Sequence, residues 1–331
     1  MNAYEEPIFV VGLPRTGSTL LENILGKSPG VLELAEVLYL TPWRKDFRYF
    51  LRKEVGDVSQ DDNLRKMVEI IFSEHGEIPG ITGTFWRMRG GIKAIGEEEL
   101  KQRVFSSLRA SDRSLASILR TLLREITEFN GHRRCVVAFP VYVNHLDNLL
   151  SWFPQAKVIH MTRDPRATAI SKTSDPGGTA IYNQRFPYLK YFIRKIMIAF
   201  VVVQYVWASR VHARFQNHSN YLLVRYEDFV MEHRRILKQI CEFVGIEYAS
   251  DMLEQPENRT QRSSVTGEVR TKADARAASK WKGVITPFEK FFVTLLCKRS
   301  MARFGFDPES HPVYVSGGEK EDPVTTRLQK I

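Results

Sequence analysis

The chain has 331 residues, 43% of them hydrophobic, and a net charge of +10, so it can bury a large core and it favours anionic ligands. Its three cysteines are odd in number and far apart, which excludes a disulfide framework, and no residue spacing predicts a metal site. The sequence has no zinc-finger spacing and no repeated basic-aromatic pattern, which makes nucleic acid the least favoured partner.

The chain is expected to open with a strand, a loop and a helix. Residues 7–11 form a short apolar run typical of a buried parallel strand, and residues 18–26 carry apolar side chains at helical spacing. Residues 40–130 are expected to form a less regular excursion over the sheet. Within it, residues 98–130 have helical periodicity, and the helix is expected to end at Asn130-Gly131.

Three further strands are expected at residues 135–139, 157–161 and 221–224. Helices are expected at residues 144–153, 165–174, 185–216, 230–244 and 288–304. The alternation predicts an α/β fold, a parallel sheet of the P-loop type with helices on both faces. We expect a single domain over residues 1–315 and a polar tail at 316–331.

The loop after the first strand has the residues of a phosphate site, Gly12-Leu13-Pro14-Arg15-Thr16-Gly17-Ser18-Thr19. The two glycines allow a tight loop whose N–H groups point inward at a helix N-terminus, and Arg15 adds a bidentate cation. Ser18 stands where a nucleoside-triphosphate site has its lysine, and no apolar run ends in a magnesium-binding aspartate. The loop therefore suits an anionic ligand other than a nucleoside triphosphate.

A second strand-to-helix junction lies at residues 157–167, with Arg163 at the end of the strand and Ser171 two turns into the helix. Both side chains can point at the carboxyl ends of the strands, where open α/β sheets bind ligands. Alone, the Arg163-Asp164 pair predicts no more than a helix cap, but together with the first loop it indicates a second anion site.

The two motifs together resemble the sulfotransferases that use 3′-phosphoadenosine 5′-phosphosulfate, most closely the bacterial glycan- and lipid-type enzymes and the protein-tyrosine sulfotransferases. Residues 14–19 resemble the 5′-phosphosulfate loop of that family, and Arg163-Asp164-Pro165-Arg166 with Ser171 resembles its 3′-phosphate motif. The similarity extends to residues 153–157, 225–228, 278–282 and 305–308, so it covers most of the chain.

The resemblance implies transfer of a sulfuryl group from that donor to a hydroxyl acceptor, namely a glycan, a lipid or a small molecule, without a metal. It implies donor contacts from Pro14, Arg15, Thr16, Gly17, Ser18, Thr19, Arg163, Ser171, Tyr226, Lys280 and Trp281, and from Ser263 or Ser264 near the sulfate bridge.

Two residues are expected to take part in the chemistry. Glu36 lies where the tyrosine sulfotransferases have their catalytic base, and a carboxylate beside a cationic site can accept a proton transiently. Arg15 would stabilise the negative charge that develops on the leaving phosphate. His145 is the second candidate for the base.

One position departs from the family pattern, because Ala138 stands where related sequences often carry a lysine. Two alternatives therefore stay open at this point. One is a P-loop nucleotide phosphotransferase similar to a kinase, and the other is a nucleotide-binding protein without catalytic activity.

The most apolar stretch, Ile196–Trp207, is shorter than a bilayer is thick, which favours a buried helix first and an interfacial helix second. With the basic amphipathic helix expected at 288–304, it also suggests peripheral membrane contact. The N-terminal residues do not resemble a signal peptide, so we expect a cytoplasmic protein. Peripheral contact of the two helices would make it membrane-associated as well.

Overall fold

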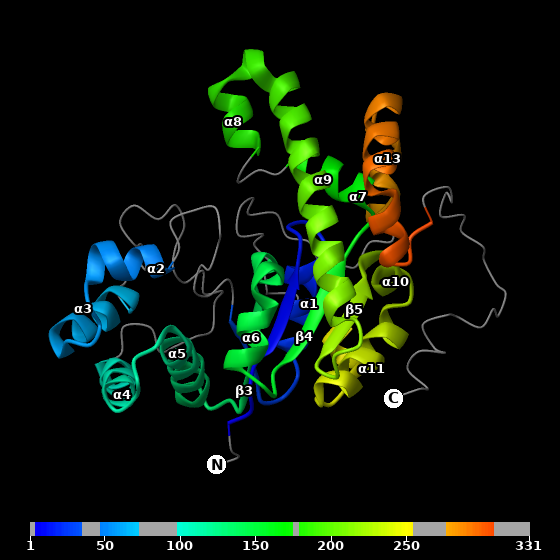
Figure 1. Cartoon of the computed structure of the whole chain (residues 1–331). Helices are drawn as coiled ribbons and strands as arrows, with labels where there is room; N and C mark the ends of the chain where they lie inside the picture. The colour runs from blue at the N-terminus through cyan, green and yellow to red at the C-terminus, as the bar shows by residue number, and fades with distance from the viewer. Residues whose placement is uncertain (1–3, 35–46, 73–97, 175–178, 254–275, 308–331) are drawn as a thin grey trace.

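The computed structural model describes residues 4–34, 47–72, 98–174, 179–253 and 276–307. Its centre is a five-stranded sheet in the order β2-β3-β1-β4-β5, and all strand pairs are parallel (Figure 1). The strands are β1 Ile8–Gly12, β2 Val31–Leu34, β3 Arg134–Ala138, β4 Lys157–Thr162 and β5 Tyr221–Arg225.

The helices surround this sheet. They are α1 Ser18–Leu25, α2 Phe47–Phe50, α3 Asp61–Ile71, α4 Glu98–Arg109, α5 Leu115–Phe129, α6 Leu146–Trp152, α7 Pro165–Thr173, α8 Thr179–Arg185, α9 Lys190–Phe215, α10 Tyr226–Met231, α11 His233–Val244, α12 Arg276–Ser279 and α13 Pro287–Arg303. Shorter helical turns occupy Leu51–Val55, Pro140–His145, Pro187–Leu189, Ser250–Leu253 and Lys280–Gly283.

The core lies in two layers, one on each face of the sheet. Because side chains alternate along a strand, Phe9 and Val11 of β1 point into the layer that contains α5, α6 and α9. Ile8 and Val10 point into the other layer, which contains α1, α10 and α11. The predicted α/β fold with helices on both faces is therefore confirmed.

The four strands predicted from the sequence are present, and β2 was not predicted. It has only four residues, Val31-Leu32-Glu33-Leu34, and it pairs on one side only, with Val31 opposite Arg134 of β3. So short a segment has no period long enough to distinguish a strand from a loop, and its pairing with β3 makes it an edge strand.

One of the predicted helices is divided in the structure, and another begins later than predicted. The segment 98–130 forms α4 and α5, and Arg113 between them adopts a left-handed backbone with φ 55°. The helix predicted at 185–216 begins with the turn Pro187–Leu189, which continues as α9, whereas Arg185 ends α8. A proline lacks the N–H donor that would continue a preceding helix, so Pro187 separates α8 from the helix that follows.

Within the excursion predicted at 40–130, residues 47–71 contain α2, a π-helical turn and α3. Leu64 and Met67 of α3 are buried in the larger core layer. Residues 73–97 of the excursion and the polar tail at 316–331 lie outside the described residues. Cys135, Cys241 and Cys297 are buried and form no disulfide, as expected.

The order of the strands fixes where a ligand can bind. The chain continues from β1 to strands on one side of it and then crosses to β4 on the other side, so the connections diverge between β1 and β4. Open α/β sheets bind ligands at the carboxyl ends of the strands at such a point. Gly12 is in register with Met161, so the loop after β1 and the residues after β4 start at the same level.

Replacing Gly12 tests how closely these two strands approach. Gly12 has φ 149°, and a Cβ at this position would lie 2.2 Å from the carbonyl oxygen of Met161, below the 3.0 Å limit of real Cβ contacts. We expect Gly12→Ala to lower the free energy of unfolding by about 3 kcal/mol or more. Urea denaturation followed by circular dichroism measures this loss.

Gly131→Ala is the matched control, because Gly131 has φ 75° and a Cβ there would meet nothing within 4 Å. It should cost only about 1 kcal/mol, the penalty of a left-handed backbone. Equal losses in the two variants would contradict the close approach of Gly12 to β4.

Candidate functional site

The loop between β1 and α1 has an unusual backbone. Gly17 caps α1 with φ 92°, and Arg15 adopts φ 77°, a left-handed conformation that is uncommon for a residue other than glycine. The hydroxyl of Thr16 donates to the carbonyl oxygen of Leu13 at 2.7 Å and closes the loop. Such strain persists only where the surroundings fix it, and it is typical of functional sites.

The structure brings the two predicted motifs into direct contact. The Nε of Arg15 donates to the Oγ of Ser171 at 3.1 Å, and a terminal nitrogen of Arg163 donates to the carbonyl oxygen of Arg15 at 3.2 Å. These residues are about 150 positions apart in the chain. The loop after β1, Arg163 after β4 and Ser171 of α7 therefore form one cationic site at the ends of β1 and β4.

The two arginines of the second motif have different partners. Arg166 is buried and pairs with both carboxylate oxygens of Asp164, its terminal nitrogen lying 2.6 Å from Oδ2. Asp164 also caps α7 by accepting the N–H of Arg166 at 2.8 Å. The helix cap considered from the sequence thus belongs to Asp164 and Arg166, and Arg163 contacts the loop.

Tyr226, the first residue of α10, packs against both motifs. The guanidinium carbon of Arg163 lies 4.5 Å from the centre of the Tyr226 ring, which is a cation–π contact. A Cβ on Gly17 would lie 2.5 Å from a carbon of the same ring. The ring can therefore cover the loop only because residue 17 is a glycine.

The segment that carries Lys280 and Trp281 lies against α7. Trp281 is buried in a small cluster with Ala167 and Ile170, and the guanidinium carbon of Arg166 lies 4.8 Å from its ring. Lys280 is exposed next to it. Trp281 thus supports the helix that carries Ser171.

The other loop residues differ in exposure. Thr16 and Ser18 are buried, whereas Pro14, Gly17 and Thr19 are partly exposed. Three predicted site residues, Glu36, Ser263 and Ser264, lie outside the described residues.

Ala138, at the position where the resemblance led us to expect a lysine, is buried at the end of β3. Its N–H donates to the Oε1 of Glu22 at 2.9 Å, and Glu22 is itself a buried residue of α1. His145, the second candidate for the base, ends the helical turn Pro140–His145 that follows β3. Glu22 was not predicted as a site neighbour, because nothing in a helical glutamate signals that it is buried.

Glu227 is a second acid next to the site that the sequence analysis did not single out. Its Oε1 accepts the N–H of Asp164 at 3.0 Å, and its Oε2 has no hydrogen-bond partner among the described residues. Burial, with a smaller contribution from the Asp164 carboxylate, raises the pKa of Glu227 to about 7, against the opposing effects of the hydrogen bond from the Asp164 N–H and, more weakly, of Arg163. Glu227 is therefore about half protonated near neutral pH.

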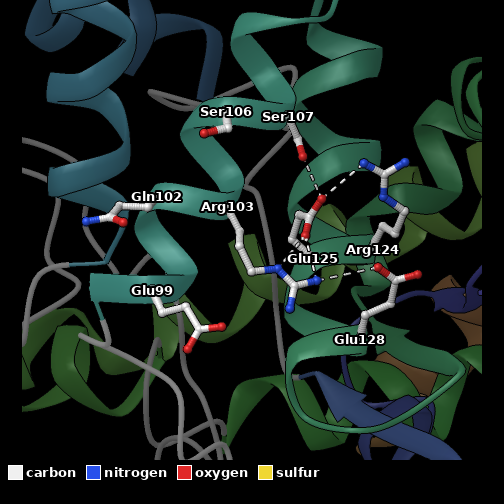
Figure 2. Close-up of a pocket in the computed structure, with 8 residues that line it drawn as sticks. All are labelled: Glu99, Gln102, Arg103, Ser106, Ser107, Arg124, Glu125 and Glu128. Carbon is white, nitrogen blue, oxygen red and sulfur yellow. Dashed lines mark hydrogen bonds and ion pairs between the residues drawn. The ribbon is translucent and has the colours of Figure 1, made fainter. Parts of the chain in front are cut away.

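A polar pocket between α4 and α5 is a separate feature (Figure 2). Glu125 lies at its centre and accepts hydrogen bonds from Ser107 at 2.7 Å and Arg124 at 3.1 Å, while Arg103 pairs with Glu125 and Glu128. Burial alone would raise the pKa of Glu125, but these bonds hold it below its usual value. Arg103, Arg124, Glu125 and Glu128 thus pair with one another, and none of the pocket's residues comes from the two motifs.

Replacing Glu227 tests its buried proton. Between pH 4.5 and about 7 the unfolded chain has lost this proton while the native chain retains it, so the residue makes the protein less stable as the pH rises. Relative to the parent, Glu227→Gln should gain about 2 kcal/mol of unfolding free energy between pH 5 and pH 8. Urea midpoints across this range measure the gain.

The unfolding free energies of parent and variant are compared at the same pH, because His160 changes the stability of both proteins with pH in the opposite direction to Glu227. Burial lowers the pKa of His160 to about 3, so this residue makes the protein more stable as the pH rises to 6.5, equally in both proteins. Glu242→Gln, on the exposed side of α11, is the control and should run parallel to the parent. A parallel profile for Glu227→Gln as well would refute the buried proton.

Comparison with known proteins agrees with this geometry. The sulfotransferase domain of the olefin synthase of Synechococcus PCC 7002 has the same fold, with a TM-score of 0.57, 22% identity, and coverage of 93% of this chain and 97% of that one. The sulfotransferase domain of the curacin biosynthetic pathway has a TM-score of 0.55, 17% identity, and coverage of 92% and 99%. A search of the curated proteins finds no match.

The match to a protein family is more extensive than either motif. The family described as the sulfotransferase family matches residues 7–250, which include all five strands, the loop with Arg15, and Arg163 with Ser171. The chain therefore belongs to the sulfotransferase family and is a sulfotransferase.

Proposed function

We propose that this sulfotransferase takes its sulfuryl group from 3′-phosphoadenosine 5′-phosphosulfate. The observation that carries the proposal is the contact of Arg15 with Ser171 and of Arg163 with the Arg15 carbonyl. A donor with a 5′-phosphosulfate and a 3′-phosphate needs two anion sites close together. The ends of β1 and β4 supply one motif each, and their register keeps them adjacent.

The residues at the loop fit this donor. The N-terminus of α1 and the side chain of Arg15 favour an anionic group at the loop, and Arg163 and Ser171 favour a second one beside it. Ser18 supplies a hydroxyl where a lysine would contact the outer phosphates of a nucleoside triphosphate. The serine and the family assignment both favour the sulfate donor over the phosphotransferase alternative.

The transfer itself is proposed as an in-line displacement. The acceptor hydroxyl oxygen bonds to sulfur, the bond from sulfur to the 5′-phosphate oxygen breaks, and the acceptor proton passes to a carboxylate. The products are the sulfated acceptor and 3′,5′-diphosphoadenosine. Arg15 and the N–H groups of the loop stabilise the charge that builds on the leaving phosphate, which is the main catalytic contribution.

We propose Glu36 as the carboxylate that takes the proton. It is the second residue after β2, and β2 is parallel to β1, so the chain leaves both strands at the same edge of the sheet. This supports a role for the segment after β2 in the site. The acceptor class is a hydroxyl of a glycan, a lipid or a small molecule, and a cytoplasmic location stays a prediction.

Donor binding is tested by replacing the two arginines. Arg15→Ala and Arg163→Ala should each weaken the binding of 3′,5′-diphosphoadenosine by about 100-fold or more, because each removes a cation from a partly buried anion site. Isothermal titration calorimetry measures the affinities. Arg109→Ala, an exposed arginine of α4 paired with Asp61, is the control and should bind like the parent. Unchanged affinity in either site variant would remove that arginine from the donor site.

The catalytic base is tested by Glu36→Gln. We expect nucleotide binding to be retained and turnover to fall by about 10²-fold or more, the usual contribution of a general base. Turnover is measured as transfer of radiolabelled sulfate from the donor into glycan, lipid and small-molecule fractions. Glu33→Gln, on β2, is the matched control and should keep its activity. Near-normal turnover in Glu36→Gln would exclude it as the base.

A further inference from the structure

Exposed apolar side chains gather on one part of this molecule. Among the described residues, fourteen of the fifteen large hydrophobic side chains that are exposed lie between 182 and 207 or between 284 and 296, and the exception is Met231. We call these fourteen the apolar face: Tyr182, Tyr188, Leu189, Tyr191, Phe192, Ile196, Phe200, Val203, Trp207, Val284, Phe288, Phe291, Leu295 and Leu296. So large a group marks an interaction surface.

The face follows from the sequence of α9, which is apolar on two sides. Phe192, Ile196, Phe200, Val203 and Trp207 recur every three or four residues and are exposed. The opposite side of the helix, which includes Val201 and Tyr205, is buried in the core. The stretch interpreted from the sequence as a buried helix is therefore buried on one side only.

The helix expected at 288–304 has the same character. In α13, Val293 and Cys297 are buried, and Phe288, Phe291 and Leu295 are exposed, with exposed fractions of 65%, 64% and 59%. The prediction of an amphipathic helix is wrong in this respect, because the side away from the core is apolar as well as basic. Two neighbouring helices thus present apolar side chains outward.

The two helices form one continuous face. They run parallel, because Arg194 pairs with Glu289 at 2.8 Å near their starts and Ser209 bonds to Ser300 at 2.8 Å near their ends. The Lys195 ammonium lies 5.0 Å from the Tyr191 ring centre and 5.1 Å from that of Phe288. In Figure 1, α8 and the first turns of α9 and α13 rise beyond the end of the sheet.

The charge of this region has a single sign. The sequence contains no acidic residue between Asp175 and Glu227. The acid of α13, Glu289, is buried and paired with Arg194 and Lys195. Exposed basic residues flank the apolar face, among them Arg185, Lys190 and Arg299.

This combination fits an anionic lipid surface. Interfacial helices place aromatic and aliphatic side chains in the bilayer and surround them with lysine and arginine, which attract acidic headgroups. A second copy of the chain fits less well, because a symmetric contact would bring like charges together. We propose that this sulfotransferase docks on anionic membranes through the apolar face.

The docked helices lie on the bilayer rather than across it. In the part of the chain that the structure describes, one helical segment, Pro187–Phe215, has the length and apolar composition to cross a membrane. However, Tyr205 and His212 on its inner side are buried against the rest of the protein, so this side of the helix is part of the fold. The stripe from Phe192 to Trp207 runs about 22 Å along the surface.

The helix α9, which carries much of the apolar face, also contacts the helix of the candidate site. A terminal nitrogen of Arg194 donates to the hydroxyl of Thr173 at 3.2 Å, at the end of the helix that carries Ser171. The docking proposal goes beyond the proposed donor and base, and it stands or fails independently of them.

Vesicle cosedimentation of the full chain without nucleotide tests the proposal. We expect sedimentation with phosphatidylcholine vesicles that contain phosphatidylglycerol, weak sedimentation with phosphatidylcholine alone, and loss of binding as salt is raised. The double change Phe288→Ser and Phe291→Ser should lower the partition coefficient by about 10-fold or more. Lys190→Glu should lower it by about 10-fold.

Met231→Ser is the matched control, because Met231 is 50% exposed on α10 and is not part of the apolar face. It should bind vesicles like the parent, and thermal unfolding should show all variants folded. No binding to the anionic vesicles, or full binding by the double variant, would overturn the proposal. The proposal would also be overturned if sedimentation equilibrium showed a dimer that the double change dissociates, and if that dimer bound no vesicles. Calorimetry with 3′,5′-diphosphoadenosine reports the donor site separately.

Discussion

The close parallel pairing of β1 with β4 is the constraint on which the rest of the site depends. Gly12 lies opposite Met161, and the backbone there leaves no room for a Cβ. Because the two strands are in register, the loop after β1 and the first residues after β4 leave the sheet side by side. The contacts of Arg15 with Ser171 and Arg163 follow from this register, although about 150 residues separate the partners in the chain.

In a cationic site of this kind the arginine charges must be held apart, and the arginine that binds the anion must not be neutralised by a protein carboxylate. The buried pair of Asp164 with Arg166 shows how the fold divides the work: one arginine fixes the start of α7, and Arg163 contacts the loop and the Tyr226 ring. Glu227 of α10 supports the same junction by accepting the N–H of Asp164. Because its pKa is raised, the Glu227 carboxyl keeps much of its proton near neutral pH. It therefore neutralises less of the positive charge of Arg163 than an ionised carboxylate would.

The helices that cover the sheet near this site are apolar on more than the side that the core requires. In α9 the buried side, with Val201 and Tyr205, accounts for the packing, and the exposed side, with Phe200 and Trp207, does not contribute to it. Water is a poor solvent for such a surface, and the basic residues beside it are the basis of the proposed docking on anionic membranes. The proposed donor site and the proposed docking face both involve neighbours of α7, because Arg194 of α9 donates to Thr173 at the end of α7.

The sequence by itself determined the strand-loop-helix units, because apolar runs, Gly12 and Gly17 in the first loop and the Asp164-Pro165 helix start are local signals. It also indicated the family and most residues now found together, including Arg15, Arg163, Ser171 and Tyr226. Only the tertiary structure decided that β2 is a strand, that Glu22 and Glu227 are buried acids, and that α9 and α13 expose an apolar side. Each of these depends on what packs against a residue from a distant part of the chain, which neither periodicity nor composition records.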